Sequence, residues 1–198
     1  MRKCNIIAGG IYSPAEKMHG NLIGFEVVDI LSKNKSRFAS LDNGGKKREK
    51  FNVDSVAFES IAIPALEGHR KYDIVVIDEI GWMELKSKNF DNVLGVIFRS
   101  EIPVLACINE DMIDRFRPFG ETFELTGDNH ELAFLKLKER IVSLLGCPII
   151  RKKQILLPST EKKQTLIETP KQVLLAPPKP VIIKEKEFYD DVRDFFGI

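Results

Sequence analysis

The chain has 198 residues, which suits one α/β domain with an additional segment, or at most two small domains. Its 30 lysines and arginines nearly balance its 29 aspartates and glutamates, and a net charge of +1 argues against nucleic acid or a membrane surface as a partner. The three cysteines, Cys4, Cys107 and Cys147, form no CxxC pair, so they predict free thiols in a reducing compartment. No signal peptide opens the chain and no apolar run reaches the roughly 20 residues of a membrane span, so a cytoplasmic protein is expected.

The amino-terminal part predicts short strands that are separated by turns. Strands are expected over residues 6–12, with a Gly-Gly bend, and over 22–31 and 37–41. From about Val53 onward, apolar residues recur at helical spacing. Pro64 is expected to kink or terminate this helix near its last turns, because proline cannot donate a backbone hydrogen bond.

The middle of the chain alternates strands with helices. Residues 73–80 contain a continuous β-branched run, which is typical of a strand buried on both faces of a parallel sheet. Ser87 is expected to cap the next helix, and residues 102–108 form another apolar strand. A short helix, a strand and a longer amphipathic helix then follow, over residues 111–116, 122–125 and about 129–146. This alternation predicts an α/β fold with a mostly parallel sheet and flanking helices.

The composition changes after Cys147. Six prolines are interleaved with lysines, so residues 148–185 are interpreted as a linker without a core of its own. Between Phe188 and Phe196 the apolar residues are spaced as on one face of a helix, and this aromatic segment has three alternatives: docking on the domain, binding a partner, or disorder. The chain is therefore divided into an α/β domain, 1–147, and a Pro/Lys-rich tail, 148–198, that carries the docking segment.

The most informative pattern is an acidic pair at the end of the buried strand. Asp78 and Glu79 follow the run Ile74-Val75-Val76-Ile77. Ligands bind at the carboxyl ends of strands in open α/β sheets. There Asp78 is suited to hold Mg²⁺ through a water, since Mg²⁺ uses only one or two carboxylates and keeps several waters. Glu79 is suited to orient and polarise a water that attacks a γ-phosphate. The alternative is a solvated loop start.

Residues 78–85, Asp-Glu-Ile-Gly-Trp-Met-Glu-Leu, resemble the Walker B signature of the small nucleoside-triphosphatase family first described from thermophiles. Further segments resemble that family in the same order, namely residues 10–14, 24–29, 58–66, 125–126 and 128–129. The resemblance covers about residues 6–146 and implies a P-loop NTPase-like fold of the RecA or ASCE type. It also implies that Trp82, Asn129 and His130 contact the nucleotide, that Asp78 binds Mg²⁺ through a water, and that Glu79 is catalytic.

The sequence departs from the family pattern in two respects. The phosphate-binding motif G-x-x-x-x-G-K-[ST] does not occur, and in the family the loop and its helix precede the strand that here begins near Ile6. The first strand and the loop are therefore expected to be absent, which would leave an unpaired sheet edge. In addition, Trp82 and His130 stand where the family has lysine and commonly arginine, which lowers the positive charge around a polyanionic ligand.

Two main hypotheses follow. In the first, the chain hydrolyses a nucleoside triphosphate to the diphosphate and phosphate, but only when a partner or an upstream segment supplies the first strand and the phosphate-binding loop. The isolated chain is then inactive or very weak, because the loop provides most of the phosphate contacts. In the second, the chain is a catalytically inactive regulatory or scaffold subunit. A third alternative, nucleic-acid binding through the lysines, is opposed by the balanced charge.

Overall fold

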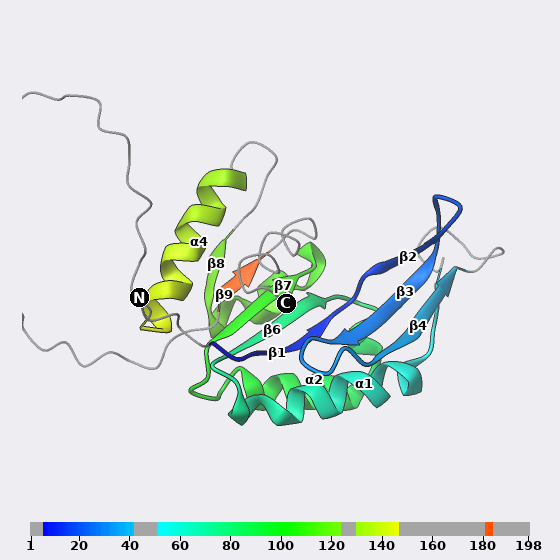
Figure 1. The fold of residues 1–198 in the computed structure, drawn as a ribbon, viewed down its shortest axis with the longest axis horizontal. Coiled ribbons are helices and arrows are strands. Elements are labelled where there is room, and N and C mark those ends of the chain that lie inside the picture. Colours follow the sequence, from blue (N-terminus) through cyan, green and yellow to red (C-terminus); the bar gives the residue numbers. More distant parts are fainter. Residues whose placement is uncertain (1–5, 42–50, 124–129, 147–180, 184–198) are drawn as a thin grey trace, which may run out of the picture.

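The structure, a computed structural model, describes residues 6–41, 51–123, 130–146 and 181–183. These residues contain one sheet with helices on both faces, as Figure 1 shows. The strands are β1 (Ala8–Tyr12), β2 (Ala15–Met18), β3 (Asn21–Asp29), β4 (Lys35–Leu41), β5 (Phe51–Val53), β6 (Ile74–Ile80), β7 (Val104–Ile108), β8 (Glu121–Phe123) and β9 (Val181–Ile183). The α-helices are α1 (Ser55–Glu67), α2 (Lys88–Ile97), α3 (Ile113–Phe116) and α4 (His130–Leu144).

The sheet has a parallel part and an antiparallel part. Its strand order is β5-β4-β3-β1-β6-β7-β9-β8, and β2 pairs with β3. The neighbours from β1 to β8 in this order are parallel, whereas β3, β4 and β5 form an antiparallel extension that projects to one side (Figure 1). The predicted α/β fold with a mostly parallel sheet is therefore confirmed. The short strands β2 and β5 were not predicted, and Val53 ends β5 instead of starting the following helix.

Close approach fixes β1 against β6. A Cβ atom added at Gly10 would lie 2.0 Å from the backbone oxygen of Val76, and the φ angle of Gly10 is +126°. A Cβ at Gly9 would lie 2.3 Å from the ring of Tyr72. The two glycines thus lie inside β1 in a continuous register with β6, and no bend interrupts the strand; Gly10 leaves room for the Val76 carbonyl and Gly9 for the Tyr72 ring. At the start of the pair, the Ile7 amide donates to the Asp73 carboxylate at 2.7 Å and the Asp73 amide donates to the Ile7 carbonyl at 2.8 Å.

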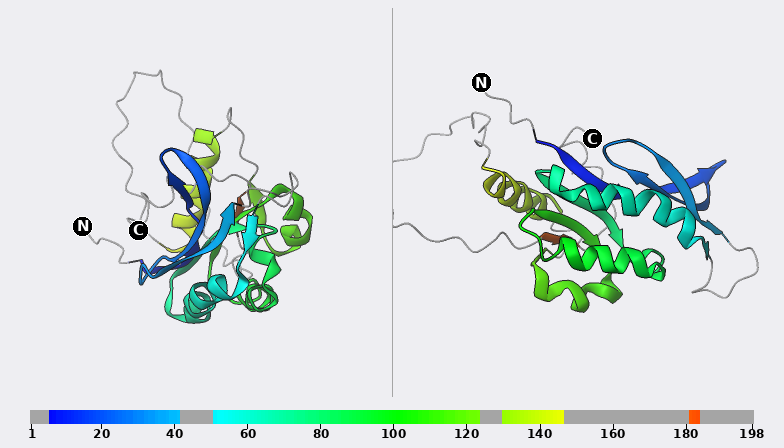
Figure 2. Two further views of the ribbon diagram at one scale, coloured as in Figure 1. Left: turned by 90° about the vertical axis from the view of Figure 1, so that its right-hand side faces the viewer. Right: turned by 90° about the horizontal axis from the view of Figure 1, so that it is seen from below.

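Helices α1 and α2 lie side by side on one face of the sheet (Figure 2). The Asp54 carboxylate caps α1 by accepting from the Ala57 amide at 3.0 Å, and the Ser87 hydroxyl caps α2 by accepting from the Phe90 amide at 3.0 Å. The predicted Ser87 cap is therefore confirmed. Pro64 lies in the last turn of α1, and the helix ends at Glu67, three residues after the proline. Its last turn persists because Ala65 and Leu66 are buried in the core.

Helix α4 covers the opposite face of the sheet (Figure 1). Its buried side chains Ala133, Leu137 and Ile141 pack against β6 and β7 from that side. On β6, Val75 and Ile77 belong to the core under α1 and α2, whereas Ile74 and Val76 belong to the core under α4. The prediction of a strand buried on both faces is thus confirmed. None of the helices in the described ranges is long and apolar enough to cross a membrane.

The last described strand changes the interpretation of the tail. Residues 181–183, which the sequence assigned to a coreless linker, form β9 between β7 and β8 and run parallel to both. Strand β7 is therefore paired on both sides, with β6 and with β9. The sequence pattern missed β9 because strand pairing is non-local and a three-residue strand carries little periodicity. The remaining tail lies outside the described residues, including the predicted aromatic segment 188–196.

Candidate functional site

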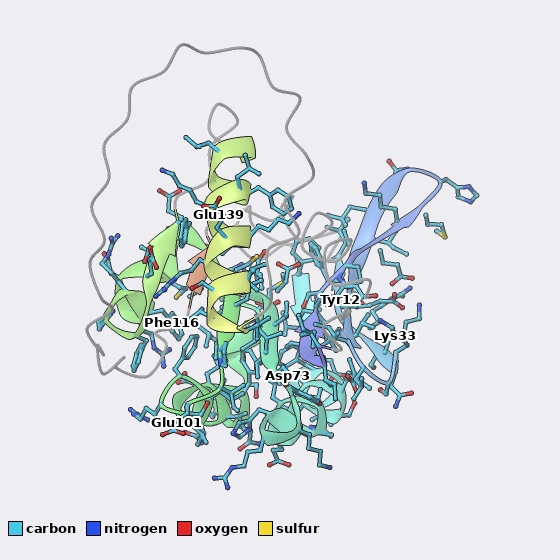
Figure 3. All side chains as sticks on the ribbon, turned by 60° about the vertical axis from the view of Figure 1, so that its left-hand side comes forward. Tyr12, Lys33, Asp73, Glu101, Phe116 and Glu139 are labelled. Carbon is cyan, nitrogen blue, oxygen red and sulfur yellow. The ribbon has the colours of Figure 1, made fainter. Side chains whose placement is uncertain are left out.

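The carboxyl ends of the parallel strands meet at one edge of the sheet, and the predicted acidic pair lies there. Strand β1 pairs with β6 in a register that places Tyr12 opposite Asp78. In Figure 3 Tyr12 lies at one end of the β1–β6 pair and Asp73, just before β6, lies at the other. On the other side of β6, Ile80 pairs with Ile108 at the end of β7. The edge therefore collects the ends of β1, β6 and β7, as parallel strands require.

A bulge in β6 sets the positions of the two carboxylates. The register between β6 and β7 shifts between Ile77 and Ile80, so that Asp78 and Glu79 share the place of one residue on β7. Bulges of this kind redirect side chains and are frequent next to active sites. Asp78 is buried at 5% exposure, and Glu79 is half-buried. One carboxylate is thus held inside the protein, and its neighbour reaches the solvent-accessible side of the same edge.

Glu84 is a third carboxylate at this edge, and sequence reasoning did not select it. Its side chain is 1% exposed, and its Oε2 accepts a hydrogen bond from the Gly81 amide at 3.1 Å. A Cβ added at Gly81 would lie 3.1 Å from Oε2 of Glu84 and 3.1 Å from Oε1 of Glu79. Gly81 therefore separates two carboxylates and leaves the space that both occupy. The signal available in the sequence was only the position of Glu84 inside the Walker B-like motif.

Neighbouring strands add neutral oxygens to the edge. Ser13 follows β1 and is 4% exposed, and its hydroxyl oxygen has no hydrogen-bond partner among the described residues. Asn109 follows β7, its amide nitrogen donates to the Ile80 carbonyl at 3.0 Å, and its Cβ lies 3.8 Å from a Cβ added at Gly81. The side-chain oxygen of Asn109 accepts from the Asp111 amide at 3.2 Å. Sequence reasoning missed both residues because only the sheet brings them beside β6.

The residues expected to contact the nucleotide have different outcomes. Trp82 lies in the turn after β6, it is 38% exposed, and the Lys86 ammonium lies 4.9 Å from the centre of its ring. This is a cation–π contact, which holds a positive charge against the indole. His130 is the first residue of α4, but its side chain lies outside the described residues, as does Asn129 entirely. Trp82 therefore lies just after Asp78 and Glu79 in the chain, and the nucleotide contacts expected of Trp82, Asn129 and His130 stay predictions.

The donor set at this edge fits a hard divalent cation. Mg²⁺ prefers oxygen ligands, and the edge offers carboxylates at Asp78, Glu79 and Glu84 with a hydroxyl at Ser13 and an amide at Asn109. In the ranges that the structure describes, no three His, Cys, Asp or Glu side chains converge as a metal cage. Mg²⁺ in phosphoryl-transfer sites uses one or two carboxylates and takes its other ligands from water and phosphate, so it does not require such a cage.

A mostly parallel sheet with helices on both faces and an acidic pair at the end of a buried central strand is the architecture of a P-loop NTPase fold. The chain belongs to the NTPase family, whose model matches residues 1–141. A relative named nucleoside-triphosphatase THEP1 from Pyrococcus abyssi is 34% identical over 139 residues, which cover 70% of this chain and 78% of the relative. A relative with the same name from Korarchaeum cryptofilum is 44% identical over 104 residues, covering 52% of this chain and 53% of the relative.

A solved structure supports the same fold. The crystal structure of THEP1 from the hyperthermophile Aquifex aeolicus matches this chain with a TM-score of 0.55 at 29% sequence identity. The match covers 70% of this chain and 83% of that one. Family membership and the P-loop NTPase fold, both expected from the resemblance of the acidic motif, are therefore confirmed.

Proposed function

We propose that this chain supplies the acidic half of a nucleoside-triphosphatase site, and that a phosphate-binding loop from another chain or an upstream segment completes it. The completed site hydrolyses a nucleoside triphosphate to the diphosphate and phosphate. The 198 residues contain no G-x-x-x-x-G-K-[ST] motif, so the proposal assigns the phosphate cradle to a source outside them. Membership of a family whose relatives are named nucleoside-triphosphatases supports the reaction type.

One observation carries the proposal. Asp78 and Glu79 lie together at the carboxyl end of the central strand β6, with the first buried and the second half-buried. A buried carboxylate is held in a fixed position, which suits a group that orients a cation and its waters. A half-buried carboxylate beside it can reach a water molecule at the same edge. The roles expected from the sequence thus agree with the burial of each side chain.

The residues would divide the chemistry as follows. Asp78 would hold Mg²⁺ through a water, and the ion would neutralise charge on the phosphates when bound. Glu79 would accept a proton from a water whose oxygen forms a bond to the γ-phosphorus, while the bond from that phosphorus to the bridging oxygen breaks. Glu84, held by the Gly81 amide at 3.1 Å, would keep the loop after β6 in place around Glu79. The cradle from outside the chain would bind the phosphates.

The contact between Trp82 and Lys86 also supports nucleotide binding. Trp82 stands where the family usually has lysine, and that change alone would remove a cation from the phosphate-binding edge. Lys86 lies with its ammonium 4.9 Å from the ring centre of Trp82. A positive charge is therefore still present beside position 82, within reach of an anionic ligand. Because the indole is 38% exposed, it also has a free surface for a nucleotide base.

The second candidate function is a catalytically inactive regulatory or scaffold subunit. The observation that favours it is the same Trp82, since a large ring in place of the family's lysine removes a cation and can fill space that a ligand would need. In this alternative the carboxylates would serve only the structure of the loop after β6. Nucleotide titrations and substitution of Glu79 distinguish the two functions.

The first experiment titrates the purified chain with Mg-ATP and Mg-GTP and follows the fluorescence of Trp82, the single tryptophan of the sequence. The expected result is no saturable change for the chain alone, and a saturable change once a loop-bearing partner is added. In that complex Glu79→Gln should abolish hydrolysis, a loss of about 10²–10⁴-fold, as for removal of a general base. The matched control is Glu101→Gln, because Glu101 lies just before β7 and so at the opposite end of the sheet.

Three outcomes would change the proposal. Full turnover by Glu79→Gln in an active complex would remove Glu79 from the catalytic role. If the complex of the unchanged chain with its partner binds nucleotide but does not hydrolyse it, although Asp78 and Glu79 are intact, the chain is an inactive subunit. A change in Trp82 fluorescence at micromolar nucleotide with the chain alone would show that no external loop is needed.

A further inference from the structure

The place of β9 in the sheet is unusual for its connectivity. Strands β7 and β8 are consecutive parallel strands along the chain, yet they are not neighbours, and β9 lies between them. Its register places Ile182 opposite Ala106 of β7 on one side and Thr122 of β8 on the other. We call this place between β7 and β8 the acceptor position. Figure 1 shows β9 there, between two strands that precede it by a long stretch of chain.

The acceptor position is also where the chain changes faces of the sheet. After β7 the chain passes to α3, whose buried Ile113 and Phe116 belong to the core on the α1–α2 side. After β8 it passes to α4, which lies on the opposite side. The point at which successive crossovers leave to opposite faces is a topological switch point, and ligands of open α/β sheets bind outside the carboxyl ends of the strands there. A strand in the acceptor position therefore ends at the edge that carries Asp78 and Glu79.

We propose that the acceptor position is a binding site for a β-strand, which β9 fills within the chain and which a strand of the loop-bearing partner fills by displacing it. The partner strand would run parallel to β7, and its carboxyl end would continue into the phosphate-binding loop. This inference rests on the proposed function and names the surface at which the two halves of that site join. Both flanks of β6 are already occupied, by β1 and β7, so the next parallel position toward the loop is the one beside β7.

The structure of the acceptor position favours exchange. Strand β9 has three residues, whereas the pair β1–β6 is in register over five. Strand β8, also three residues long, has β9 as its sole pairing partner within the described residues. Residues 124–180 join β8 to β9, so β9 is bound as a tethered segment and not as part of a tight turn. A longer partner strand makes more backbone hydrogen bonds than the three-residue β9 and can therefore outcompete it.

The test uses the full chain and a fluorescein-labelled synthetic peptide of residues 177–186. Ile182→Pro removes a backbone donor from a strand that is paired on both sides, so it should release β9 from the acceptor position. The variant chain is expected to bind the labelled peptide saturably in fluorescence anisotropy, with an affinity at least about tenfold above that of the unchanged chain, because its tethered competitor is gone. Thr165→Pro is the matched control, with proline placed outside β9, and should bind like the unchanged chain.

A second peptide tests the partner. It carries residues 177–183 followed by the sequence Gly-x-x-x-x-Gly-Lys-Ser, and it should compete with the labelled peptide as well as the unlabelled parent does. A peptide with proline at position 182 should not compete. Failure of the loop-bearing peptide alone would show that the carboxyl exit of the acceptor position does not admit a loop, and would overturn the partner assignment.

Other results overturn the acceptor position itself. If the Ile182→Pro chain folds and binds no peptide, the acceptor position is not a binding site for a strand. If that variant does not fold, the unchanged chain decides, since an excess of labelled peptide must then exchange with β9 and raise the anisotropy over time. Absence of exchange there also overturns the proposal. No nucleotide enters these measurements, so their outcome is independent of whether the completed site hydrolyses one.

Discussion

The two flanks of the central strand β6 are built in different ways. On the β1 side, five residue pairs are in register, two glycines allow close approach, and the amides of Ile7 and Asp73 close the start of the pair. Beyond β7, on the other flank, β9 contributes three residues from the far end of the chain, and β8 depends on it. The first flank is continuous with the antiparallel extension, whereas the second is completed by a tethered segment (Figure 1).

This difference indicates a division of roles. The carboxylates Asp78 and Glu79 stand on β6 itself, at the end of its five-pair register with β1, which suits groups whose positions must not vary. The flank toward which the phosphate cradle is proposed to join is the one with short, exchangeable pairing. Local stability is not uniform in folded domains, and segments that exchange or bind partners come from the less stable end of the range. Substitutions on the two flanks should therefore have effects of different kinds.

The largest expected effect comes from disrupting the pairing of β1 with β6, which we call the firm flank of β6. Gly10→Ala should lower the free energy of unfolding by more than about 3 kcal/mol, because the added Cβ would meet the Val76 carbonyl oxygen at 2.0 Å and the φ angle of +126° is unfavourable for alanine. Urea denaturation followed by circular dichroism measures this change. A loss below 1 kcal/mol would mean that β1 can shift away from β6 without cost.

The control for this prediction is Gly20→Ala in the turn between β2 and β3. Gly20 also has a positive φ angle, of +81°, but an added Cβ would meet nothing within 4 Å. Gly20→Ala should then lower the free energy of unfolding by about 1 kcal/mol, which is the cost of a positive φ angle for alanine. The difference between the two variants isolates the close approach of β1 to β6.

Sequence reasoning identified the strands that correspond to β1, β6, β7 and β8, and it missed β9 between the last two. The β-branched run of β6 and the cap of α2 at Ser87 are local signals, and both are found in the structure. The strands β2, β5 and β9 are short, and their pairing partners decide whether they form, so a single-chain pattern does not reveal them. Helix α1 continues for three residues after Pro64, and burial of Leu66 stabilises this last turn.

The next effect is a gain on the exchangeable flank. Replacing residues 184–191 by Gly-x-x-x-x-Gly-Lys-Ser would place a phosphate-binding loop directly after β9, at the edge that carries Asp78. The unchanged chain is expected to bind Mg-ATP too weakly to detect, whereas this variant should give a saturable change in Trp82 fluorescence. The expected gain in affinity is about 10²-fold, since backbone amides and a lysine cradle the phosphates in such loops.

Two controls belong to the loop variant. Adding Asp78→Asn should weaken Mg-ATP binding more than binding of ATP without Mg²⁺, because the carboxylate acts through the cation. The same eight residues placed at 160–167, away from β9, should produce no gain. A gain of equal size at both places would contradict the assigned position of β9, since a loop then binds ATP wherever it stands.

The site itself was only partly accessible to sequence reasoning. Asp78 and Glu79 are adjacent in the chain, so their pairing required no knowledge of the fold. Glu84 and Asn109 approach Gly81 through the bulge in β6 and the end of β7, and such contacts follow from the register of the strands. Ser13 becomes part of the same edge only through the parallel pairing of β1 with β6.

A smaller effect should follow from filling the space at Gly81. Gly81→Ala places a Cβ at 3.1 Å from the carboxylate oxygens of Glu79 and Glu84, so both side chains must shift by a few tenths of an ångström. Hydrolysis by the completed complex should fall about tenfold, because catalytic groups lose rate when displaced from their productive geometry. Gly95→Ala in α2 is the control, since its Cβ meets only the flexible end of Arg99. Equal rates for the two variants would contradict a tightly positioned Glu79.

The smallest effect concerns acid, and it lies on the helix layer that supports the firm flank. The pKa of Glu59 is lowered from 4.5, first by the hydrogen bond from the Ser87 hydroxyl at 2.5 Å and then by that from the Asn89 amide at 2.8 Å. A folded-state pKa below the unfolded value adds stability above pH 4.5, and this contribution is lost as the pH falls through the folded-state pKa. Because Ser87 also caps α2, protonation of Glu59 weakens the junction of α1 with α2. Glu59→Gln should therefore be less stable than the unchanged chain near neutral pH and approach it in acid. Urea denaturation near neutral pH and in acid measures this convergence, and Glu67→Gln at the exposed end of α1 is the control. If the free energies of unfolding of Glu59→Gln and the unchanged chain differ by the same amount at both pH values, the charge of Glu59 does not contribute.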